Sequence, residues 1–164
     1  MSNDHRDLPH RHDRRPRLDP VVYGPSGYAT HVNIGAYRHR PVLTVDDGVA
    51  RLIFDCLQNA AAAHNATLYV YCLMPDHLHF VAAINPGGTT ITKLVQSFGI
   101  RVTTKTKHLK PPPLFQRSFY DTVLEDHSEL VGRCEYVIGN PVRKHLVEDW
   151  RDYPYTWLAP EMGT

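Results

Sequence analysis

Cysteine is scarce in this chain of 164 residues, which has three cysteines and no CxxC pair. The odd number and the missing CxxC pair argue against a disulfide framework or a cysteine-based zinc site, and they favour a reducing, cytoplasmic setting. Long hydrophobic runs are also missing, so no segment qualifies as a transmembrane helix. The first twenty residues are polar throughout and do not resemble a signal peptide.

The remaining composition is that of an ordinary globular domain. Apolar residues make up 42% of the chain and charged residues 21%, and the length suits one domain with its own core. Residues 1–20 contain five arginines and four aspartates but almost no apolar side chains, which predicts a flexible polar arm. We expect residues 21–164 to form a single domain.

Acidic residues are absent between Asp76 and Asp121, although the net charge of the whole chain is only +1. This interval holds six cations, namely Lys93, Arg101, Lys105, Lys107, Lys110 and Arg117. A concentrated positive stretch in a near-neutral domain indicates a docking surface for a polyanion. On charge alone, a solvated helix face followed by a basic loop explains the pattern equally well.

Hydrophobic periodicity predicts the element order strand, helix, strand, strand, helix, strand, helix. The expected strands are 30–36, 67–74, 77–84 and 114–124. The expected helices are 46–64, a second helix, and 128–140. The second helix is capped by Thr89 or Thr90, and its apolar stripe runs from Ile91 to Val102. The first six elements make a βαββαβ unit, which is an α+β, ferredoxin-like antiparallel sheet with helices on one face. This arrangement leaves the other face open, and chemistry is expected there.

Two histidines stand two residues apart in the strand expected over 77–84. His77 and His79 share one face, and the apolar row that begins at Leu78 and Phe80 takes the other. A slip of one residue would bury both histidines, so the apolar row fixes the register. Two imidazoles on the exposed side can reach one divalent cation. A HxH pair is also common by chance, and a lone strand histidine is usually an ordinary polar residue.

The C-terminal helix offers further candidate groups. Tyr136 and Asn140 are one turn apart and lie nearly opposite the apolar side of this helix. Both are either ordinary surface residues, or Asn140 is a cation ligand and Tyr136 is a nucleophile that attacks a phosphate. A phosphotyrosine conserves the energy of the broken bond, which strand transfer needs and hydrolysis does not. Other tyrosines compete for this role, but none has a potential ligand four residues later on a helix: Tyr69, Tyr71 and Tyr120.

Three motifs together resemble those of the single-tyrosine transposases. Residues 71–81 (YCLMPDHLHFV) resemble their HUH segment, in which a hydrophobic residue separates two histidines. Residues 114–121 (LFQRSFYD) resemble the strand before the tyrosine helix, and residues 136–143 (YVIGNPVR) the tyrosine-helix signature of the REP-associated branch. The likeness covers about residues 28–158 in the same order.

This resemblance implies an enzyme that cuts and rejoins single-stranded DNA. It implies that His77, His79 and Asn140 bind a catalytic Mg²⁺ or Mn²⁺ ion, and that Tyr136 forms a 5′-phosphotyrosine and releases a 3′-hydroxyl. The implied substrates are repetitive extragenic palindromes (REP elements), bound as hairpins by a monomer or homodimer at the nucleoid. Asn140 replaces the glutamine of mobile relatives, which favours the domesticated branch of the family.

Basic residues then become candidate phosphate contacts. The expected DNA-binding set comprises Arg38, Arg40, Lys93, Arg101, Lys105, Lys107, Lys110, Arg117, Arg143 and Lys144. Two alternatives stay open at this point. One is a metal-dependent phosphodiesterase in which water attacks, and the other is a hairpin-binding protein of the same fold without cleavage activity.

Overall fold

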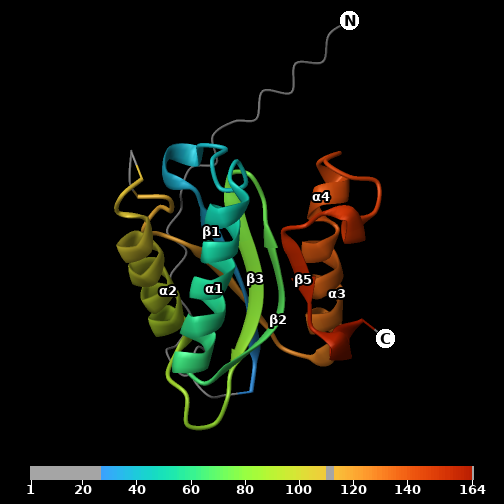
Figure 1. The fold of residues 1–164 in the computed structure, drawn as a ribbon. Coiled ribbons are helices and arrows are strands. Elements are labelled where there is room, and N and C mark those ends of the chain that lie inside the picture. Colours follow the sequence, from blue (N-terminus) through green and yellow to red (C-terminus); the bar gives the residue numbers. More distant parts are fainter. Residues whose placement is uncertain (1–26, 110–112, 164) are drawn as a thin grey trace, which may run out of the picture.

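A five-stranded antiparallel sheet in the order β4-β1-β3-β2-β5 forms the centre of the molecule (Figure 1). The computed structural model describes residues 27–109 and 113–163. Its strands are β1 (Ala29–Gly35), β2 (Ala66–Leu73), β3 (His77–Ile84), β4 (Tyr120–Leu124) and β5 (Thr156–Leu158). With the intervening helices, β1 to β4 follow the βαββαβ order, so the predicted ferredoxin-like class is confirmed.

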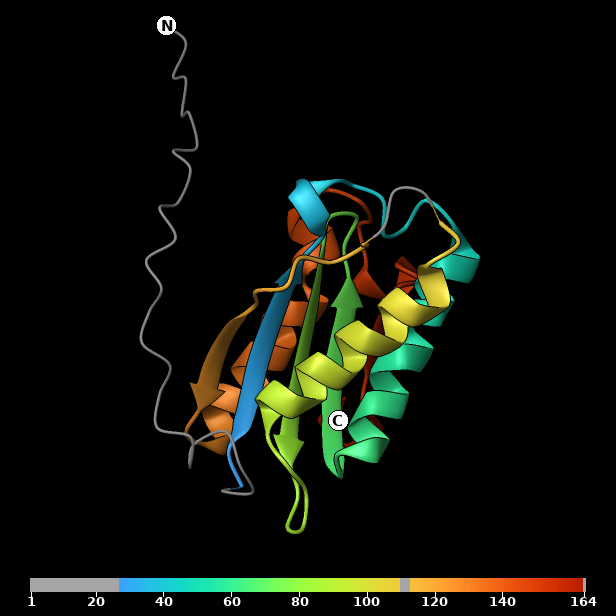
Figure 2. The ribbon, with the colours of Figure 1, turned by 90° about the vertical axis from the view of Figure 1, so that its left-hand side faces the viewer.

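Two long helices, α1 (Asp47–Ala63) and α2 (Ile91–Thr106), cover one face of the sheet (Figure 2). They bury the alternate β3 residues that begin with Leu78 and Phe80, both of which are fully inaccessible. The predicted α2 stripe lies in this core. Thr90 caps α2 by accepting a hydrogen bond from a backbone N–H, one of the two caps that the sequence allowed.

The opposite face of the sheet carries α3 (His127–Ile138) and the short α4 (Asn140–Arg143), as Figure 1 shows. The prediction that this face is open is therefore wrong. Cys134 and Val137 of α3 pack with Val81 of β3 in a second hydrophobic core. The reason is that β3 is apolar on both faces beyond His79, and both faces of such a strand need cover.

Local boundaries differ from the sequence prediction at two places. Only Tyr120–Leu124 of the expected strand 114–124 is β4, because the chain before it crosses the end of β1, where Phe115 forms a single bridge to Ala36. Helix α3 begins after Asp126 rather than at Ser128, since the Asp126 carboxylate accepts the hydrogen bond that caps the first turn.

Short elements complete the described part of the chain, namely the 3₁₀ helices η2 (Tyr37–His39), η3 (Trp150–Asp152) and η4 (Pro160–Met162). Strand β1 ends and β3 begins at the end of the sheet drawn uppermost in Figures 1 and 2, where η2 and α4 also lie. The predicted arm (1–20) and Lys110 fall outside the described residues. Across 27–109 and 113–163, none of the helices has the length and apolar character needed to cross a membrane.

Candidate active site

Strand β3 places His77 and His79 on the face that α3 covers. Their ring centroids are 4.6 Å apart and the ring planes are perpendicular. In the antiparallel register, Gly35 of β1 lies opposite His77, and Cys72 of β2 lies opposite His79. His77 is half-buried, but His79 is only 4% exposed, so the pair lies under the helix layer rather than on an open surface.

The Nδ1 atoms of both histidines are engaged within the protein. Nδ1 of His77 lies 2.6 Å from a carboxylate oxygen of Asp76, and Nδ1 of His79 lies 3.0 Å from Nε2 of His31. No residue that the structure describes bonds to the Nε2 atom of either His77 or His79. Because a carboxylate accepts the Nδ1 proton of His77, the lone pair of that ring is on Nε2, where a metal ion would bind.

Burial keeps the inner histidines neutral. It lowers the pKa of His79 to about 2, and the nearby His77 and His31 contribute to the same effect. Burial likewise lowers the pKa of His31 to about 4, with a further contribution from the positive charge of Arg133. A neutral imidazole retains a lone pair and does not repel a cation, so this environment suits a metal ligand.

Tyr136 lies on the last turn of α3 and is 46% exposed. Its ring meets those of His79 and His31 nearly at right angles, with centroids 6.3 Å and 6.4 Å away. The predicted nucleophile and the predicted ligand His79 are therefore neighbours within a single chain.

Arg143 of α4 ties the tyrosine to Asn140. Its guanidinium carbon lies 4.2 Å from the centre of the Tyr136 ring. The guanidinium also donates to the backbone carbonyl of Tyr136 and to Oδ1 of Asn140, the latter over 3.1 Å. This close approach requires glycine at position 139, because a Cβ there would lie 2.6 Å from a guanidinium nitrogen of Arg143.

Asn140 is buried and only partly satisfied. Its Oδ1 accepts the bond from Arg143, whereas its Nδ2 has no hydrogen-bonding partner in the described structure. Among residues 27–109 and 113–163, no group of three or more His, Cys, Asp or Glu side chains could hold a metal ion. If a metal ion binds here, a third protein ligand would be of another type, and the second lone pair of the Asn140 oxygen is a candidate.

Gln116 is a site residue that the sequence did not reveal. A Cβ on Gly35 would lie 2.7 Å from Nε2 of Gln116, so the glutamine carboxamide fills that space. Gly35 lies opposite His77, and paired residues of a sheet share a face, which places this carboxamide at the rim of the histidine pair. A backbone hydrogen bond from Gln116 to the Gly35 carbonyl, 3.0 Å long, holds the segment there.

Several of the predicted DNA contacts lie at the same end of the sheet. Arg38 lies within η2 and Arg40 directly follows it, and the guanidinium carbons of both lie within about 6 Å of the centre of the Tyr37 ring. Arg38 adopts a left-handed backbone conformation (φ 56°), which costs a non-glycine residue roughly 1–2 kcal/mol. Five further predicted contacts are also exposed. They lie at the C-terminal end of α2, shortly after the bridge of Phe115 to Ala36, and at the end of α4: Lys105, Lys107, Arg117, Arg143 and Lys144.

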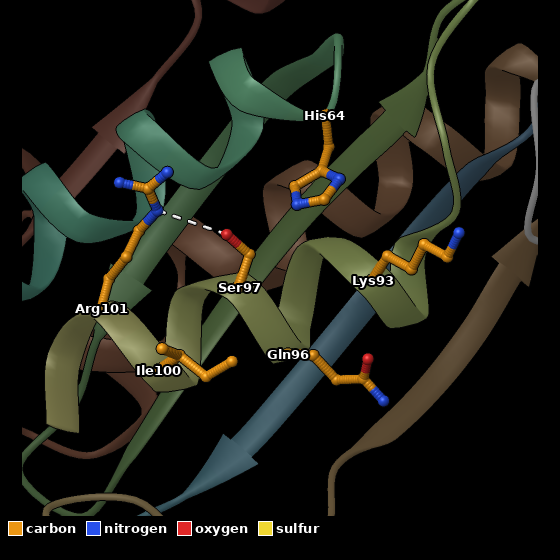
Figure 3. Close-up of a pocket in the computed structure, with 6 residues that line it drawn as sticks. All are labelled: His64, Lys93, Gln96, Ser97, Ile100 and Arg101. Atoms are coloured by element: carbon orange, nitrogen blue, oxygen red, sulfur yellow. Dashed lines mark hydrogen bonds between the residues drawn. The ribbon is translucent and has the colours of Figure 1, made fainter. Parts of the chain in front are cut away.

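Lys93 and Arg101 lie elsewhere, on the outer surface of α2. They line an open pocket of about 380 Å³, together with residues that include His64 and Ser97 (Figure 3). Arg101 donates a hydrogen bond to the Ser97 hydroxyl over 3.3 Å. Lys105 lies one turn further along α2, in its last turn, so the predicted basic set divides between the C-terminal end of α2 and the pocket on its earlier turns.

The sheet and the position of Tyr136 beside the strand histidines agree with the single-tyrosine transposases that the sequence motifs resemble. The chain belongs to the IS200-like transposase family, because the family model described as "Transposase IS200 like" matches residues 26–138. It is therefore an enzyme of the transposase type, a class that acts on DNA.

Similar proteins agree with this assignment. A Haemophilus influenzae protein provisionally named as a REP-associated tyrosine transposase is 20% identical over 132 residues, which is 70% of this chain and 75% of that protein. The solved structure of a REP-associated tyrosine transposase bound to a REP hairpin superimposes with a TM-score of 0.71 at 15% identity, over 87% of this chain and 81% of that one. The structure of a Deinococcus radiodurans R1 protein that is provisionally named a transposase gives a TM-score of 0.50 at 22% identity, over 77% of this chain and 97% of that one.

Proposed function

We propose that this transposase is a metal-dependent single-stranded DNA endonuclease and strand transferase with Tyr136 as its nucleophile. It cuts and rejoins DNA next to REP-like hairpins. The observation that carries this proposal is the approach of the Tyr136 ring to within 6.3 Å of the His79 ring inside one chain. A tyrosine used only for packing would not need to be half-exposed beside two imidazoles whose Nε2 atoms are free.

The cleavage step is an exchange of phosphate esters. Oη of Tyr136 forms a bond to phosphorus, the bond from phosphorus to O3′ breaks, and the leaving oxygen becomes a 3′-hydroxyl by taking a proton from water. The phenolic proton of Tyr136 passes to solvent. Rejoining reverses these events, because a 3′-hydroxyl attacks the phosphotyrosine and the phenol leaves.

His77, His79 and Asn140 would hold the divalent cation, Mg²⁺ or Mn²⁺. When bound, this cation polarises the phosphate and stabilises the negative charge that builds on its oxygens. Two imidazole nitrogens and one carboxamide oxygen suit Mn²⁺ better than Mg²⁺, which prefers oxygen ligands alone. Arg143 stacks on the phenol and donates to Asn140, so it orients both groups and places a positive charge beside the incoming phosphate.

The proposed partner is DNA with a hairpin and an adjoining single strand. The basic residues at the site end of the sheet would neutralise its phosphates, and the hairpin-bound protein of similar fold supports this choice. A transposase of this kind acts where its DNA lies, so we place it in the cytoplasm at the nucleoid. Since one chain contributes both Tyr136 and the histidines, a monomer is sufficient for cleavage.

A covalent-adduct assay tests the proposal. The protein is incubated with a labelled REP-like hairpin that carries single-stranded flanks, in the presence of Mn²⁺, and resolved on a denaturing gel. We expect a protein–DNA adduct that Tyr136→Phe abolishes and EDTA prevents. Tyr120→Phe is the matched control, because Tyr120 is 51% exposed and its strand register places it on the same face as His79. It should leave the adduct unchanged.

The same assay separates the alternatives. Cleavage that persists in Tyr136→Phe would assign the attack to water and make the protein a phosphodiesterase. Tight hairpin binding without cleavage in either metal would make it a binding protein of the transposase fold. An adduct that depends on Tyr120 would move the nucleophile to β4.

A further inference from the structure

His31 is a buried histidine to which the proposed function gives no role. It lies on β1 and is 7% exposed. Its Nε2 is 3.0 Å from Nδ1 of His79, and the two rings stack with centroids 5.1 Å apart. The same ring meets the Tyr136 ring nearly edge-on. His31 therefore contacts a proposed metal ligand and the proposed nucleophile at once.

We propose that His31 is a positioning residue that keeps His79 in the tautomer able to bind the cation, a role that rests on the proposed function. A cation on Nε2 of His79 requires the ring proton to be on Nδ1, and this N–H then donates to Nε2 of His31. His31 in turn carries its own proton on Nδ1. The reverse hydrogen bond would put the proton of His79 on Nε2, where it would block the metal.

Asp76 supports this assignment by comparison, because it makes the equivalent contact with His77. Each proposed imidazole ligand has its Nδ1 held and its Nε2 free. The two partners differ in charge, since Asp76 is a carboxylate and His31 is neutral. Of these two partners, His31 is the one that lies against Tyr136, where the DNA phosphate would be bound. A carboxylate there would repel that anion, so a neutral acceptor is the better partner for His79.

A role in packing alone leads to a different expectation. His31 lies opposite Val81 on β3 and Thr122 on β4, in a layer that also contains the second hydrophobic core. If its ring only filled this space, leucine would replace it without any effect on metal binding. The hydrogen-bonded role instead requires an acceptor atom at the position of Nε2.

Metal titration of the DNA-free protein distinguishes these roles. Free Mn²⁺ is measured by electron paramagnetic resonance for the wild type, His31→Leu and His31→Gln, with His77→Ala as the reference for a lost ligand. We expect His31→Leu to weaken Mn²⁺ binding by about 10–100-fold, and His31→Gln, whose side-chain oxygen accepts the same bond, by roughly threefold or less. Wild-type affinity in His31→Leu would overturn the role of His31 but leave the proposed function standing.

A second variant and a second measurement make the test independent of one substitution. His31→Asp should bind Mn²⁺ at least as tightly as the wild type but form the DNA adduct about tenfold more slowly, because of the added negative charge. Nitrogen-15 NMR of the Mg²⁺-loaded wild type should show His79 with its proton on Nδ1. A proton on Nε2 would overturn the proposal without any variant. A wild-type protein that binds neither metal would overturn the metal-dependent function itself.

Discussion

Arg143 and Tyr136 form a cation–π pair in which the guanidinium carbon lies 4.2 Å from the ring centre. The same guanidinium bonds to the Asn140 carboxamide, so one side chain orients both the proposed nucleophile and a proposed ligand. These three residues lie within two turns of chain that begin on α3 and end on α4. Their arrangement depends on the short break between the two helices at Gly139.

Gly139→Ala should slow adduct formation without unfolding the protein. Its φ of −74° suits any residue, but a Cβ would lie 2.6 Å from a guanidinium nitrogen of Arg143 and push that side chain away. We expect a loss of about tenfold in rate, since small misplacements at a reacting centre are costly. Gly132→Ala, earlier on α3, is the matched control because a Cβ there meets nothing within 4 Å. An equal effect of the two variants would contradict the prediction.

Metal-free protein should lose stability as the pH falls. The folded-state pKa of His31, about 4, is below its unfolded value of 6.5, so the unfolded state binds more protons between these values. The stabilising contribution is complete above pH 6.5 and declines by about 1.4 kcal/mol per pH unit down to about pH 4. Urea unfolding in EDTA at pH 7.5 and pH 5 measures this. His31→Gln should reduce the difference by about 2 kcal/mol, whereas an unchanged difference would refute the assignment.

The salt dependence of DNA binding should reveal which basic surface contacts the hairpin. Replacing Lys105 and Lys107 with alanine should weaken binding and reduce the slope of log affinity against log salt by about 1.5, since each lost phosphate contact accounts for 0.7–0.9. The paired variant Lys93→Ala/Arg101→Ala should reduce the slope less, because those cations lie on the outer face of α2. Fluorescence anisotropy with one labelled hairpin measures both. A larger effect at Lys93 and Arg101 would move the main contact surface from the C-terminal end of α2 to the pocket on its earlier turns.

Tyr153→Phe should destabilise the fold by about 1–3 kcal/mol, because it leaves a buried carbonyl without its donor. The Tyr153 hydroxyl donates to the backbone carbonyl of Leu73 over 2.9 Å and fastens the C-terminal segment to β2. Tyr155→Phe is the control, since the Tyr155 hydroxyl bonds to the exposed carboxylate of Asp47 and should cost less. Chemical denaturation measures both variants. Equal losses in the free energy of unfolding would mean that the buried hydrogen bond of Tyr153 stabilises the fold no more than the exposed one of Tyr155.

Local patterns in the sequence were sufficient for much of the fold. The alternation of His77, Leu78 and His79 defined β3 and its orientation, and the structure confirms the strand from His77 to Ile84. The spacing of apolar residues predicted the buried face of α2 in the same way. Both patterns are visible within one element, because the burial of each face follows from the period of the strand or helix.

Contacts between distant segments were not predictable in this way. The β5 strand has only three residues, and it is a strand because it pairs with β2. Three residues are too few to show a hydrophobic alternation that would predict this pairing. In a regular strand Tyr69 and Tyr71 would lie on the same face, but the register shifts between Leu68 and Val70, and the two rings belong to different cores. An irregularity of one residue reverses every later side chain.

The candidate site shows the same division. Sequence motifs identified His77, His79, Tyr136 and Asn140, and the structure brings the two histidines and the tyrosine together while linking Asn140 to them through Arg143. His31 was missed, because its contact with His79 joins residues 48 positions apart. Their roles in catalysis stay predictions for the assays above.

Helix α3 covers one face of the sheet, and Tyr136 lies on its last turn, so the proposed nucleophile is reached at the end of this helix rather than across an open face of the sheet. A nucleophile at the end of a helix would accommodate flexible single-stranded DNA more easily than a rigid double helix. A palindromic element is single-stranded only when its two complementary strands are separated. Under the proposed function, this position of α3 would make cleavage depend on DNA that is already unpaired.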